Sequence, residues 1–560
     1  MATKARFQAI RGTRDLLPPD TALWNRVEQT ARDVFRTFGF GEIRPPIFEP
    51  TELFARAVGG ETDIVSKEMY TLEDYEASDL LEHRTALLTW KDREPSQTGP
   101  LGVGMPARFQ PFFELCQLFF KLARQSFDRG LVPRTPENEA FLRVFEGEVQ
   151  AFQGTIQSQT LEECRRAVNS LKERTRTFVL GDSLALRPEA TASVCRAYIE
   201  HNMQQWPQPV KLYYMGPMFR RERPQKGRYR QFYQIGAEVL EAARPDSAKD
   251  AAKELAKDAA VDAEVIEMVM TFFSRLRLEG AQLEINSIGH AAHAAGGENV
   301  CRREYVEKLR ADLRKAKDKL GADSQRRIET NPLRVLDSKL EHEQGIIESL
   351  PRIADHLCAD CKAHYAELKR QLDLRGVPYK ENWRLVRGLD YYMRTTFEIT
   401  ARGLGSQNAV CGGGRYDGLV ELLGGPPAKG IGFAIGEDRL ILSLQESAKA
   451  REAGKPESPA ASRQSMDVYI AWTGANTYAT ALRAAKNLRS AGVRVELPPA
   501  EQKFGKALER ASKLGSRFAL ILGENEVQSG EWTLKNLADG SQQKLDEPQL
   551  LKLLSERSSA

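Results

Sequence analysis

Apolar residues recur every three or four positions near the start of the chain, which predicts an amphipathic helix. The stripe consists of Leu23, Val27, Ala31, Val34 and Phe38. Gly39 follows as a stop signal, and the two prolines of "GEIRPPIFEP" predict extended backbone after it. Longer patterns of helical period occupy residues 107–178 and 299–375.

Alternating apolar and polar positions predict a β-hairpin over 210–241, with "RPQKGR" as its connection. The core-facing side of the second arm consists of Tyr233, Ile235, Ala237 and Val239. The other face carries Gln234 and Glu238 with Gly236 between them. Glycine weakens a strand and adds no packing, so it indicates that another group approaches the backbone. This face is either a polar floor for a small ligand with a cationic group or an ordinary solvent-facing side.

Further strand-like runs lie at 283–288, 384–400 and 429–435. Residues 242–260 are rich in alanine, lysine and aspartate and show no apolar stripe, so they predict a solvated, helical insertion without a core-facing side. The segment 446–465 is charged and rich in small residues, which makes it the best linker in the chain.

Three β-like runs beyond this linker alternate with two helical patterns. The runs are "VYIAW", "VRVEL" and "FALIL", and the helical patterns cover 477–490 and 501–513. This alternation predicts a small α/β domain with a largely parallel sheet. Within 483–517, nine basic residues stand against three acidic ones, a local charge of +6. Such a concentration suits RNA binding, and a solvated helix surface is the alternative.

The chain has 560 residues, of which 41% are hydrophobic and 28% are charged. At about 150 residues per domain, this length predicts roughly three to four globular domains and excludes a single small binding module. The net charge is only +4, so nucleic-acid binding requires local basic patches. Seven scattered cysteines, no apolar leader and no run of about 18 apolar residues predict a cytoplasmic enzyme with no membrane segment.

A basic run follows the first arm of the hairpin. Residues 220–230 hold six basic residues against Glu222, a local charge of +5. Arginine matches phosphate geometry with paired donors, so the run suits a nucleotide or a nucleic-acid backbone. Most charge runs are solvated surface, but this one adjoins the face that holds Gln234 and Glu238, which favours a binding site.

Three more motifs combine glycine, charge and aromatic rings. "RGLDYY" (387–392) precedes a strand, and "CGGGRYDGLVELLGG" (411–425) is neither a Walker A loop nor a dinucleotide fingerprint. "GIGFAIGEDRLIL" predicts a strand that runs into a helix with Arg439 in its first turn, which suits an anion.

The pair Cys358 and Cys361 has the CxxC spacing of half a zinc site or of a redox pair. There is no second CxxC, and His356 and His364 complete no known spacing. We therefore expect two unliganded cysteines within a helix, no zinc and no other protein-bound metal site. The absence of HExxH leaves hydrolytic zinc chemistry without support.

Several of these segments resemble class II aminoacyl-tRNA synthetases. "FGFGEIRPPIFEP" resembles motif 1, "GPMFRRERPQKGRYRQFYQIGAEVLE" motif 2 and "GIGFAIGEDRL" motif 3. "ALRPEATASVCRAY" (185–198), "RGLDYY" and "CGGGRYDGL" resemble the blocks specific to the histidyl-tRNA synthetase family. The resemblance covers residues 1–74, 181–241, 261–445 and the region from 466 onward.

The resemblance implies an α+β fold, namely an antiparallel class II synthetase sheet flanked by helices, with helical insertions and a C-terminal α/β domain. The implied segments are catalytic parts 1–74, 181–290 and 381–445, helical insertions 75–180 and 291–380, a linker 446–465 and an anticodon-binding domain 466–560. Residues 75–180 and 243–258 lengthen connections that are usually short in the family.

The resemblance also implies roles for individual residues. Histidine would be bound by Glu189, Ala190, Thr191, Gln234, Glu238, Tyr391 and Tyr392, with Glu189 and Thr191 at its amino group and Glu238 at its imidazole. ATP would be bound by Arg220 at the α-phosphate, Glu222 beside the adenine, Arg228, and Arg439 at the γ-phosphate. Arg387 and Arg220 would be the catalytic cations, with Arg387 doing work that many class II enzymes give to Mg²⁺.

The implied reaction forms histidyl-adenylate and pyrophosphate, and then transfers the histidyl group to the 3′ end of tRNA(His). The implied partners are L-histidine, ATP with Mg²⁺, tRNA(His) and a second copy of the chain in a homodimer. One alternative is a regulatory paralogue that keeps the fold without aminoacylation, which Arg220, Arg387, Glu238, Arg439 and the C-terminal domain disfavour. Another class II synthetase is the second alternative, and "RGLDYY" with the Gln234 and Glu238 pair argues against it.

Overall fold

The chain divides into two compact units, one formed by Met1–Thr13 with Asp33–Ser443 and the other by Arg14–Arg32 with Leu444–Ala560. A computed structural model describes residues 7–59, 62, 64–74, 78–91, 105–158, 160–225, 227–243, 251–290, 301–387, 389, 391–402, 404, 408–452, 466–474 and 476–558. The expected N-terminal helix is present as α1 (Asp20–Thr37), and its apolar stripe is buried at Val27, Ala31 and Val34.

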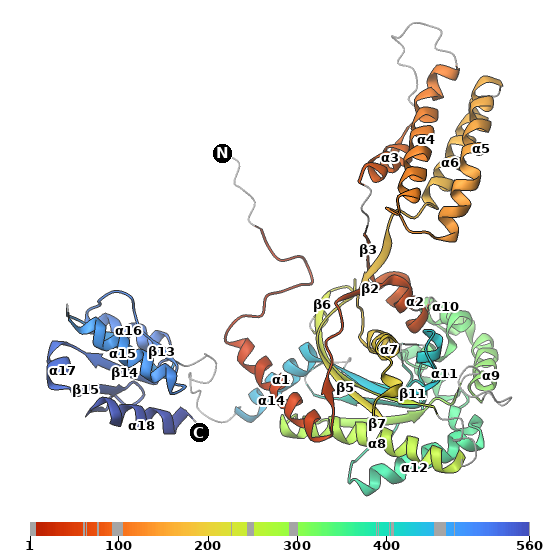
Figure 1. Cartoon of the computed structure of the whole chain (residues 1–560). Coiled ribbons are helices and arrows are strands. Elements are labelled where there is room, and N and C mark those ends of the chain that lie inside the picture. The colour runs from red at the N-terminus through yellow and green to blue at the C-terminus, as the bar shows by residue number, and fades with distance from the viewer. Residues whose placement is uncertain are drawn as a thin grey trace. The chain divides into compact units, whose positions relative to one another are not determined.

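An eight-stranded sheet forms the centre of the first unit, in the order β1-β5-β6-β11-β10-β9-β7-β8 (Figure 1). Its strands are β1 (Gly41–Glu42), β5 (Val210–Phe219), β6 (Gln231–Ala242), β11 (Ala428–Gly436), β10 (Ala409–Arg415), β9 (Met393–Thr400), β7 (Gln282–Ser287) and β8 (Lys380–Glu381). Only the two edge strands β1 and β8 pair in parallel, and the six central strands are antiparallel to one another. The predicted α+β class is therefore confirmed.

The predicted hairpin is β5 with β6, paired from Val210 opposite Leu240 to Phe219 opposite Gln231. Its expected core face is buried at Ile235, Ala237 and Val239. The opposite face is also buried, because Glu238 is only 1% exposed and a layer of helices covers this side. The solvent-facing alternative for this face is therefore wrong.

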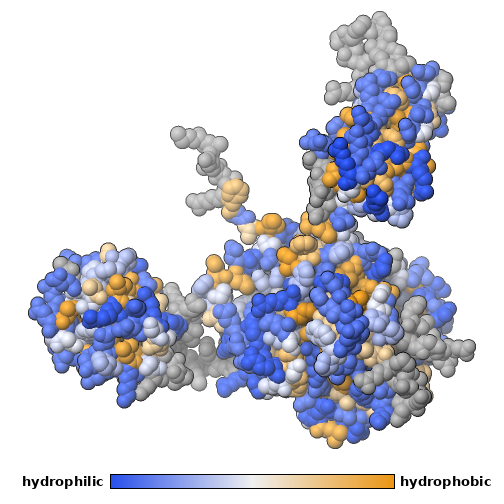
Figure 2. All heavy atoms as spheres, in the orientation of Figure 1, coloured by the Kyte–Doolittle hydropathy of each residue, from blue (hydrophilic) through white to orange (hydrophobic). Residues whose placement is uncertain are grey.

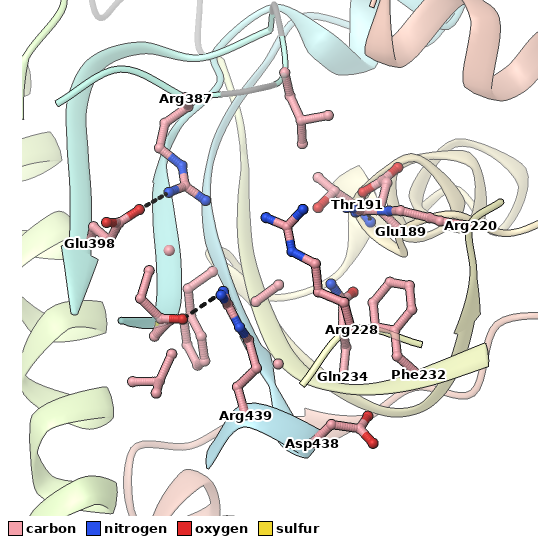
Figure 3. Close-up of a pocket in the computed structure, with 18 of the residues that line it drawn as sticks. Glu189, Thr191, Arg220, Arg228, Phe232, Gln234, Arg387, Glu398, Asp438 and Arg439 are labelled. Atoms are coloured by element: carbon pink, nitrogen blue, oxygen red, sulfur yellow. Dashed lines mark hydrogen bonds and ion pairs between the residues drawn. The ribbon is translucent and has the colours of Figure 1, made fainter. Parts of the chain in front are cut away.

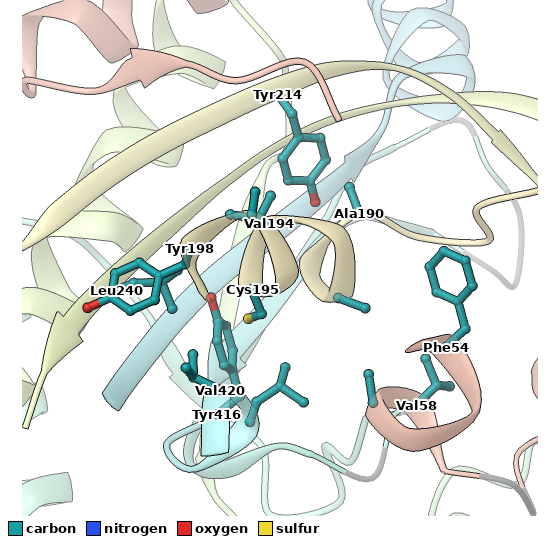
Figure 4. Packing of buried hydrophobic residues seen from close by; sticks show 14 of the residues in the cluster. Phe54, Val58, Ala190, Val194, Cys195, Tyr198, Tyr214, Leu240, Tyr416 and Val420 are labelled. Atoms are coloured by element: carbon teal, nitrogen blue, oxygen red, sulfur yellow. The ribbon is translucent and has the colours of Figure 1, made fainter. Parts of the chain in front are cut away.

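Helices α7 (Thr191–Glu200), α2 (Thr51–Val58) and α13 (Leu419–Leu422) pack on the Glu238 face of the sheet. Figure 4 shows α7 lying across the strands, with Val194, Cys195 and Tyr198 in a shared apolar core with Tyr214 and Leu240. This core fixes the N-terminus of α7, which follows the "ALRPEA" segment, over the central strands.

Helices α8 (Ala251–Arg275) and α12 (Ala359–Leu374) lie on the other side of the sheet. The helix expected within 242–260 is confirmed for residues 251–260, which form the first turns of α8, but the expected lack of a core-facing side is wrong, because Asp258 and Ala259 are buried. Asp258 is 3% exposed and accepts hydrogen bonds from Lys429 Nζ at 2.9 and 3.1 Å. One turn later, Asp262 bonds to the buried guanidinium of Arg415 at 2.5 Å. Residues 244–250 lie outside the described part of the chain.

The expected helical insertion at 75–180 leaves and rejoins the fold through an antiparallel ladder between β3 (Tyr70–Asp74) and β4 (Asp182–Leu186). Strand β2 (Phe48–Pro50) completes this small sheet. The helices are η1 (Ile64–Glu68) before the ladder, then α3 (Ser78–Thr89), α4 (Met105–Asp128), α5 (Pro136–Ser158) and α6 (Leu161–Arg176). Helices α3 to α6 enclose a phenylalanine-rich core of their own. Figure 2 shows apolar residues among hydrophilic ones on the visible face of this bundle. Leu118 and Val144 are exposed apolar residues of the bundle.

A second helical region leads from β7 to β8, as predicted for 299–375. Its further elements are α9 (Cys301–Lys315), η4 (Lys317–Lys319), α10 (Ala322–Thr330), η5 (Pro332–Val335), α11 (Glu341–Glu348) and η6 (Ile353–His356). Their common core also includes Ile288, Val386 and Tyr392 of the sheet region. The short turn η2 (Met203–Gln205) follows α7.

The C-terminal domain has a five-stranded sheet in the order β13-β12-β14-β15-β16. Its elements are β12 (Val468–Trp472), α15 (Thr477–Ser490), β13 (Val495–Glu496), α16 (Phe504–Lys513), β14 (Phe518–Leu522), α17 (Glu524–Ser529), β15 (Trp532–Asn536), β16 (Gln542–Leu545) and α18 (Glu547–Ser558). The three predicted strands are parallel, but β15 and β16 add two antiparallel strands, so the sheet is mixed.

Helix α14 (Glu437–Glu452) follows β11 directly, as the strand-to-helix motif predicted. It includes the first seven residues of the expected linker, and residues 453–465 lie outside the described part of the chain. None of the helices in the described ranges combines the length and the apolar character needed to cross a membrane.

Candidate functional site

A cavity of about 260 Å³ opens on the α7 side of the eight-stranded sheet. Figure 3 shows its wall, to which β6, β10, β11, the start of α7 and the segment before β9 contribute. The predicted residues that line it are Glu189, Thr191, Arg220, Glu222, Arg228, Gln234, Arg387, Tyr391, Tyr392 and Arg439. The fold thus brings together residues that are up to 250 positions apart (439 − 189).

Hydrogen-bond acceptors form one part of this wall. Glu189 accepts the backbone N–H groups of Thr191 at 2.7 Å and Ala192 at 3.0 Å, so its carboxylate holds the N-terminus of α7. Burial raises the pKa of Glu189, although these bonds oppose the shift. The amide oxygen of Gln234 is buried and has no hydrogen-bond partner among the described residues. An acceptor left in this state at a cavity wall suits a ligand that donates N–H groups.

Glu238 lies behind this wall and does not line the cavity. Its carboxylate accepts a hydrogen bond from Thr191 Oγ1 at 2.7 Å and another from the Tyr416 hydroxyl at 2.6 Å. Burial raises the pKa of Glu238 to about 8 against the opposing effect of these two bonds. Because Thr191 uses its only hydroxyl proton here, its oxygen can offer only lone pairs to a ligand.

Two arginines of the basic run enter the cavity around one carboxylate. Arg228 Nη1 donates to Glu222 Oε2 at 3.2 Å, and Arg220 Nη1 lies 3.8 Å from Glu222 Oε1. Arg220 is held further by a bond from its Nε to the Pro188 carbonyl at 2.9 Å and by the Phe232 ring, 5.2 Å away. Glu222 therefore sets the positions of both guanidinium groups.

Two more arginines enter from the other side in Figure 3. Arg387 Nη1 donates to Glu398 Oε2 at 2.9 Å, while its buried Nε has no hydrogen-bond partner among the described residues. Arg439 Nη1 donates to the Ala409 carbonyl at 2.8 Å, and burial and the nearby Arg228 lower its pKa. Crowded cations with a spare N–H donor suit an anionic ligand such as a polyphosphate.

Gly236 does mark a close approach to the backbone, as its place in the strand indicated. A side chain at this position would overlap the Tyr214 hydroxyl and the Phe433 carbonyl. The approaching group is therefore a tyrosine of the neighbouring strand β5, which corrects the expectation that a ligand lies there. Gly412 of the "CGGG" block makes room in the same way for the Arg387 guanidinium.

The sequence did not single out several residues of the site. Glu398 is the one acid in strand β9, a signal that could have identified it as the partner of Arg387. Asp438 accepts the Tyr233 backbone N–H at 2.9 Å and so joins the start of α14 to β6. Ala190, by contrast, was predicted as a binding residue but is fully buried and does not line the cavity.

A separate group of possible metal ligands lies outside this cavity. His290, Cys301, Cys358 and Cys361 place one ligand atom each within 4.8 Å of one another. Cys358 is the N-cap of α12, so the pair lies at a helix end rather than within a helix. The expectation of two unliganded cysteines without zinc therefore has no support in this geometry.

Comparisons with known proteins agree over nearly the whole chain. A family described as "Histidyl-tRNA synthetase" matches residues 160–440, and one described as "Anticodon binding domain" matches 467–557. The histidine–tRNA ligase of Koribacter versatilis (strain Ellin345) is 44% identical over 544 residues, 97% of this chain and 95% of its own length. That of Solibacter usitatus (strain Ellin6076) is 41% identical over 540 residues, 96% of each chain.

Among solved structures, the apo histidyl-tRNA synthetase of S. aureus is similar with a TM-score of 0.61 and 28% identity, covering 98% of this chain and 100% of its own. The match to the Koribacter protein leaves only about 3% of this chain uncovered (100 − 97). The long segment 75–180 therefore does not set this chain apart from such relatives.

Proposed function

Because this chain belongs to the histidyl-tRNA synthetase family and is a histidine–tRNA ligase, we propose that the cavity on its eight-stranded sheet is where ATP activates histidine. One observation carries this proposal: the same cavity presents buried acceptors at Gln234 and Thr191 and a group of four arginines. A ligand that carries an ammonium group and an imidazole needs the hydrogen-bond acceptors, and a triphosphate needs the arginines.

We propose that Glu189 and Thr191 bind the histidine amino group. While Glu238 is ionised, the Thr191 oxygen can only accept from a ligand because its proton goes to Glu238, and Glu189 keeps further lone pairs beside its two backbone bonds. Ala190 lies between them and acts through its backbone position at the start of α7.

We propose that the imidazole N–H is recognised by Gln234 at the cavity wall together with Glu238 directly behind that wall. In the ionised form of Glu238, each carboxylate oxygen has a second lone pair beyond the bonds from Thr191 and Tyr416. Tyr391 and Tyr392, with ring centroids 4.7 Å apart, line the cavity and supply flat apolar surface for the imidazole ring.

The arginines would bind ATP around the reacting phosphorus. Arg220 and Arg387 would contact the α-phosphate, and Arg439 would contact the γ-phosphate. Arg228 would contact the phosphates in the middle of the cavity. Glu222 accepts from the adenine side while it holds Arg220 and Arg228 in place. Mg²⁺ would accompany ATP, since it takes phosphate oxygens and one or two carboxylates as ligands, and Glu222 and Glu398 line the cavity.

The proposed chemistry needs no covalent enzyme nucleophile. The histidine carboxylate attacks the α-phosphorus, the bond to pyrophosphate breaks, and the 3′-hydroxyl of the tRNA then displaces AMP from the adenylate. Negative charge grows on the phosphoryl oxygens in the first step. Fixed arginines stabilise that charge without reorganising, which lowers the barrier.

We propose that the C-terminal domain binds the anticodon of tRNA(His). All nine basic residues of 483–517 are exposed. Lys503 and Lys506 lie at the start of α16, which packs on one face of the sheet, while α15 and α18 pack on the other. Exposed cations of this kind hold an RNA backbone while unstacked bases are recognised.

A chain truncated after residue 465 should keep histidine-dependent pyrophosphate exchange but charge tRNA poorly. Losing these contacts should raise the KM for tRNA at least about tenfold, equivalent to about 1.4 kcal/mol of binding. In the full chain, Lys503→Glu with Lys506→Glu should act in the same direction. Lys552→Glu on α18 is the matched control and should leave the KM unchanged. Equal charging by the intact and truncated chains would refute the assignment.

We further propose that the chain acts as a homodimer in the cytoplasm. None of its seven cysteines, all of which lie in the described part of the chain, forms a disulfide, which suits a reducing compartment. The regulatory alternative is not favoured, because a regulatory paralogue without aminoacylation does not need the anticodon-binding domain matched at 467–557.

A further inference from the structure

His290, Cys301, Cys358 and Cys361 meet at the junction of the sheet with the second helical region. His290 follows β7, Cys301 begins α9, and Cys358 and Cys361 belong to the N-terminus of α12. His290, Cys301 and Cys361 are buried and Cys358 is half-buried. Three separate parts of the chain thus deliver their ligand atoms to one point.

Four of the six distances between these atoms lie close to the edges of a zinc tetrahedron, and all six are within 4.8 Å. Bonds of about 2.3 Å to sulfur and about 2.0–2.1 Å to nitrogen place sulfur atoms about 3.8 Å apart, and sulfur and nitrogen about 3.5 Å apart. Cys301 Sγ lies 3.9 Å from Cys361 Sγ. His290 Nδ1 lies 3.2 Å from Cys361 Sγ, 3.5 Å from Cys301 Sγ and 3.9 Å from Cys358 Sγ.

The backbone around this group is arranged to admit the sulfur atoms. Gly289 has a φ of +64°, and a side chain there would come within 2.8 Å of Cys301 Sγ. The Cys361 backbone N–H donates to Cys358 Sγ at 3.5 Å, as the N-cap of α12. Backbone N–H groups and the positive end of a helix both stabilise a thiolate, which is the form that binds a metal.

We propose that His290, Cys301, Cys358 and Cys361 bind one structural Zn²⁺ ion. Three thiolates and one imidazole form a closed tetrahedral set, which favours zinc over oxygen-seeking cations. The ion would replace the thiol protons and join the end of β7 to α9 and α12. Whether zinc binds here does not depend on the function proposed for the cavity.

The zinc site would also support the histidine pocket from behind. Arg302, next to Cys301, donates to the Tyr392 carbonyl, and Arg394 donates its backbone N–H to the Gly289 carbonyl at 2.6 Å. Tyr392 shares an apolar core with Cys301 and Cys361. Fixing these two cysteines therefore fixes the segment that carries Tyr392.

The first test is the metal content of the purified full-length chain by elemental analysis. About one zinc per chain is expected, and Cys301→Ser or Cys361→Ser should lose it. Cys164→Ser is the matched control: Cys164 is also buried, its S–H donates to the Thr155 carbonyl at 3.7 Å, and serine can keep that bond. This variant should keep its zinc.

The second test avoids variants, since serine in this core could prevent folding. The wild-type chain, stripped of zinc and loaded with Co²⁺, should show intense visible bands of tetrahedral cobalt and sulfur-to-cobalt charge transfer. Zinc should bleach these bands and raise the melting temperature of the stripped chain. Octahedral cobalt, no tightly held metal, or a Cys301–Cys361 disulfide in the purified protein would each overturn the proposal.

Discussion

Replacing Arg387 by alanine is expected to slow formation of histidyl-adenylate about a hundredfold or more, because a preorganised cation at developing charge contributes that much. Arg387 meets the geometric requirement, with one guanidinium nitrogen held by Glu398 at 2.9 Å and a buried Nε free of any described partner. Burial opposes its charge, but the neighbouring Tyr392 and Glu398 outweigh burial and raise the pKa of Arg387, so it remains a cation.

Single-turnover adenylation, measured beside equilibrium histidine binding, separates the two possible roles. Arg387→Ala should leave histidine affinity nearly unchanged, and transfer from preformed adenylate should suffer less than adenylation. Arg375→Ala is the control, since Arg375, the C-cap of α12, is also partly buried and ion-paired, to Glu267 at 3.1 Å, and does not line the cavity. An unimpaired adenylation rate in Arg387→Ala would remove Arg387 from the mechanism.

Replacing Glu238 by alanine is expected to reduce histidine-dependent pyrophosphate exchange about a hundredfold, because removing one partner of a buried recognition pair costs a few kcal/mol. The loss should fall mainly on the apparent affinity for histidine. It has two physical sources: the imidazole N–H loses its acceptor, and Thr191 is freed to turn its hydroxyl proton toward the ligand. Unchanged exchange and affinity would contradict this role.

Glu238→Gln keeps the volume and one acceptor, and it separates recognition from folding. The pKa of Glu238 is raised to about 8 from 4.5, so the native state holds a proton that the unfolded chain has lost between these values. The raised pKa of Glu238 therefore contributes fully to the stability of the native state below about pH 4.5, and this contribution is lost as the pH rises to about 8. Urea unfolding should show that the free energy of unfolding falls more between about pH 5 and pH 8 for the wild type than for Glu238→Gln.

The hairpin and the strand-to-helix motif could be predicted because their signals are local. The period of two in β6 separates Ile235 and Ala237 from Gln234 and Glu238, and the turn holds the two arms in register. Local pattern could not show that both faces are buried. That depends on α7, whose residues precede the hairpin and pack over it only in the folded chain.

The sequence predictions that were wrong or unsupported have the same cause, namely contacts with residues that are far away in the sequence. Residues 242–260 show no apolar stripe, yet Asp258 is buried because Lys429, 171 positions away, neutralises it. The CxxC pair looked incomplete because its third and fourth ligands, His290 and Cys301, are 71 and 60 positions from Cys361. Spacing within one helix carries no information about such partners.

The most direct measurement of the central claim is ATP–pyrophosphate exchange by the purified full-length chain with each of the twenty amino acids in turn. Because the cavity joins buried acceptors near Glu238 to four arginines, histidine alone should support exchange. Exchange driven better by another amino acid, or none with histidine, would contradict the proposal that this cavity activates histidine.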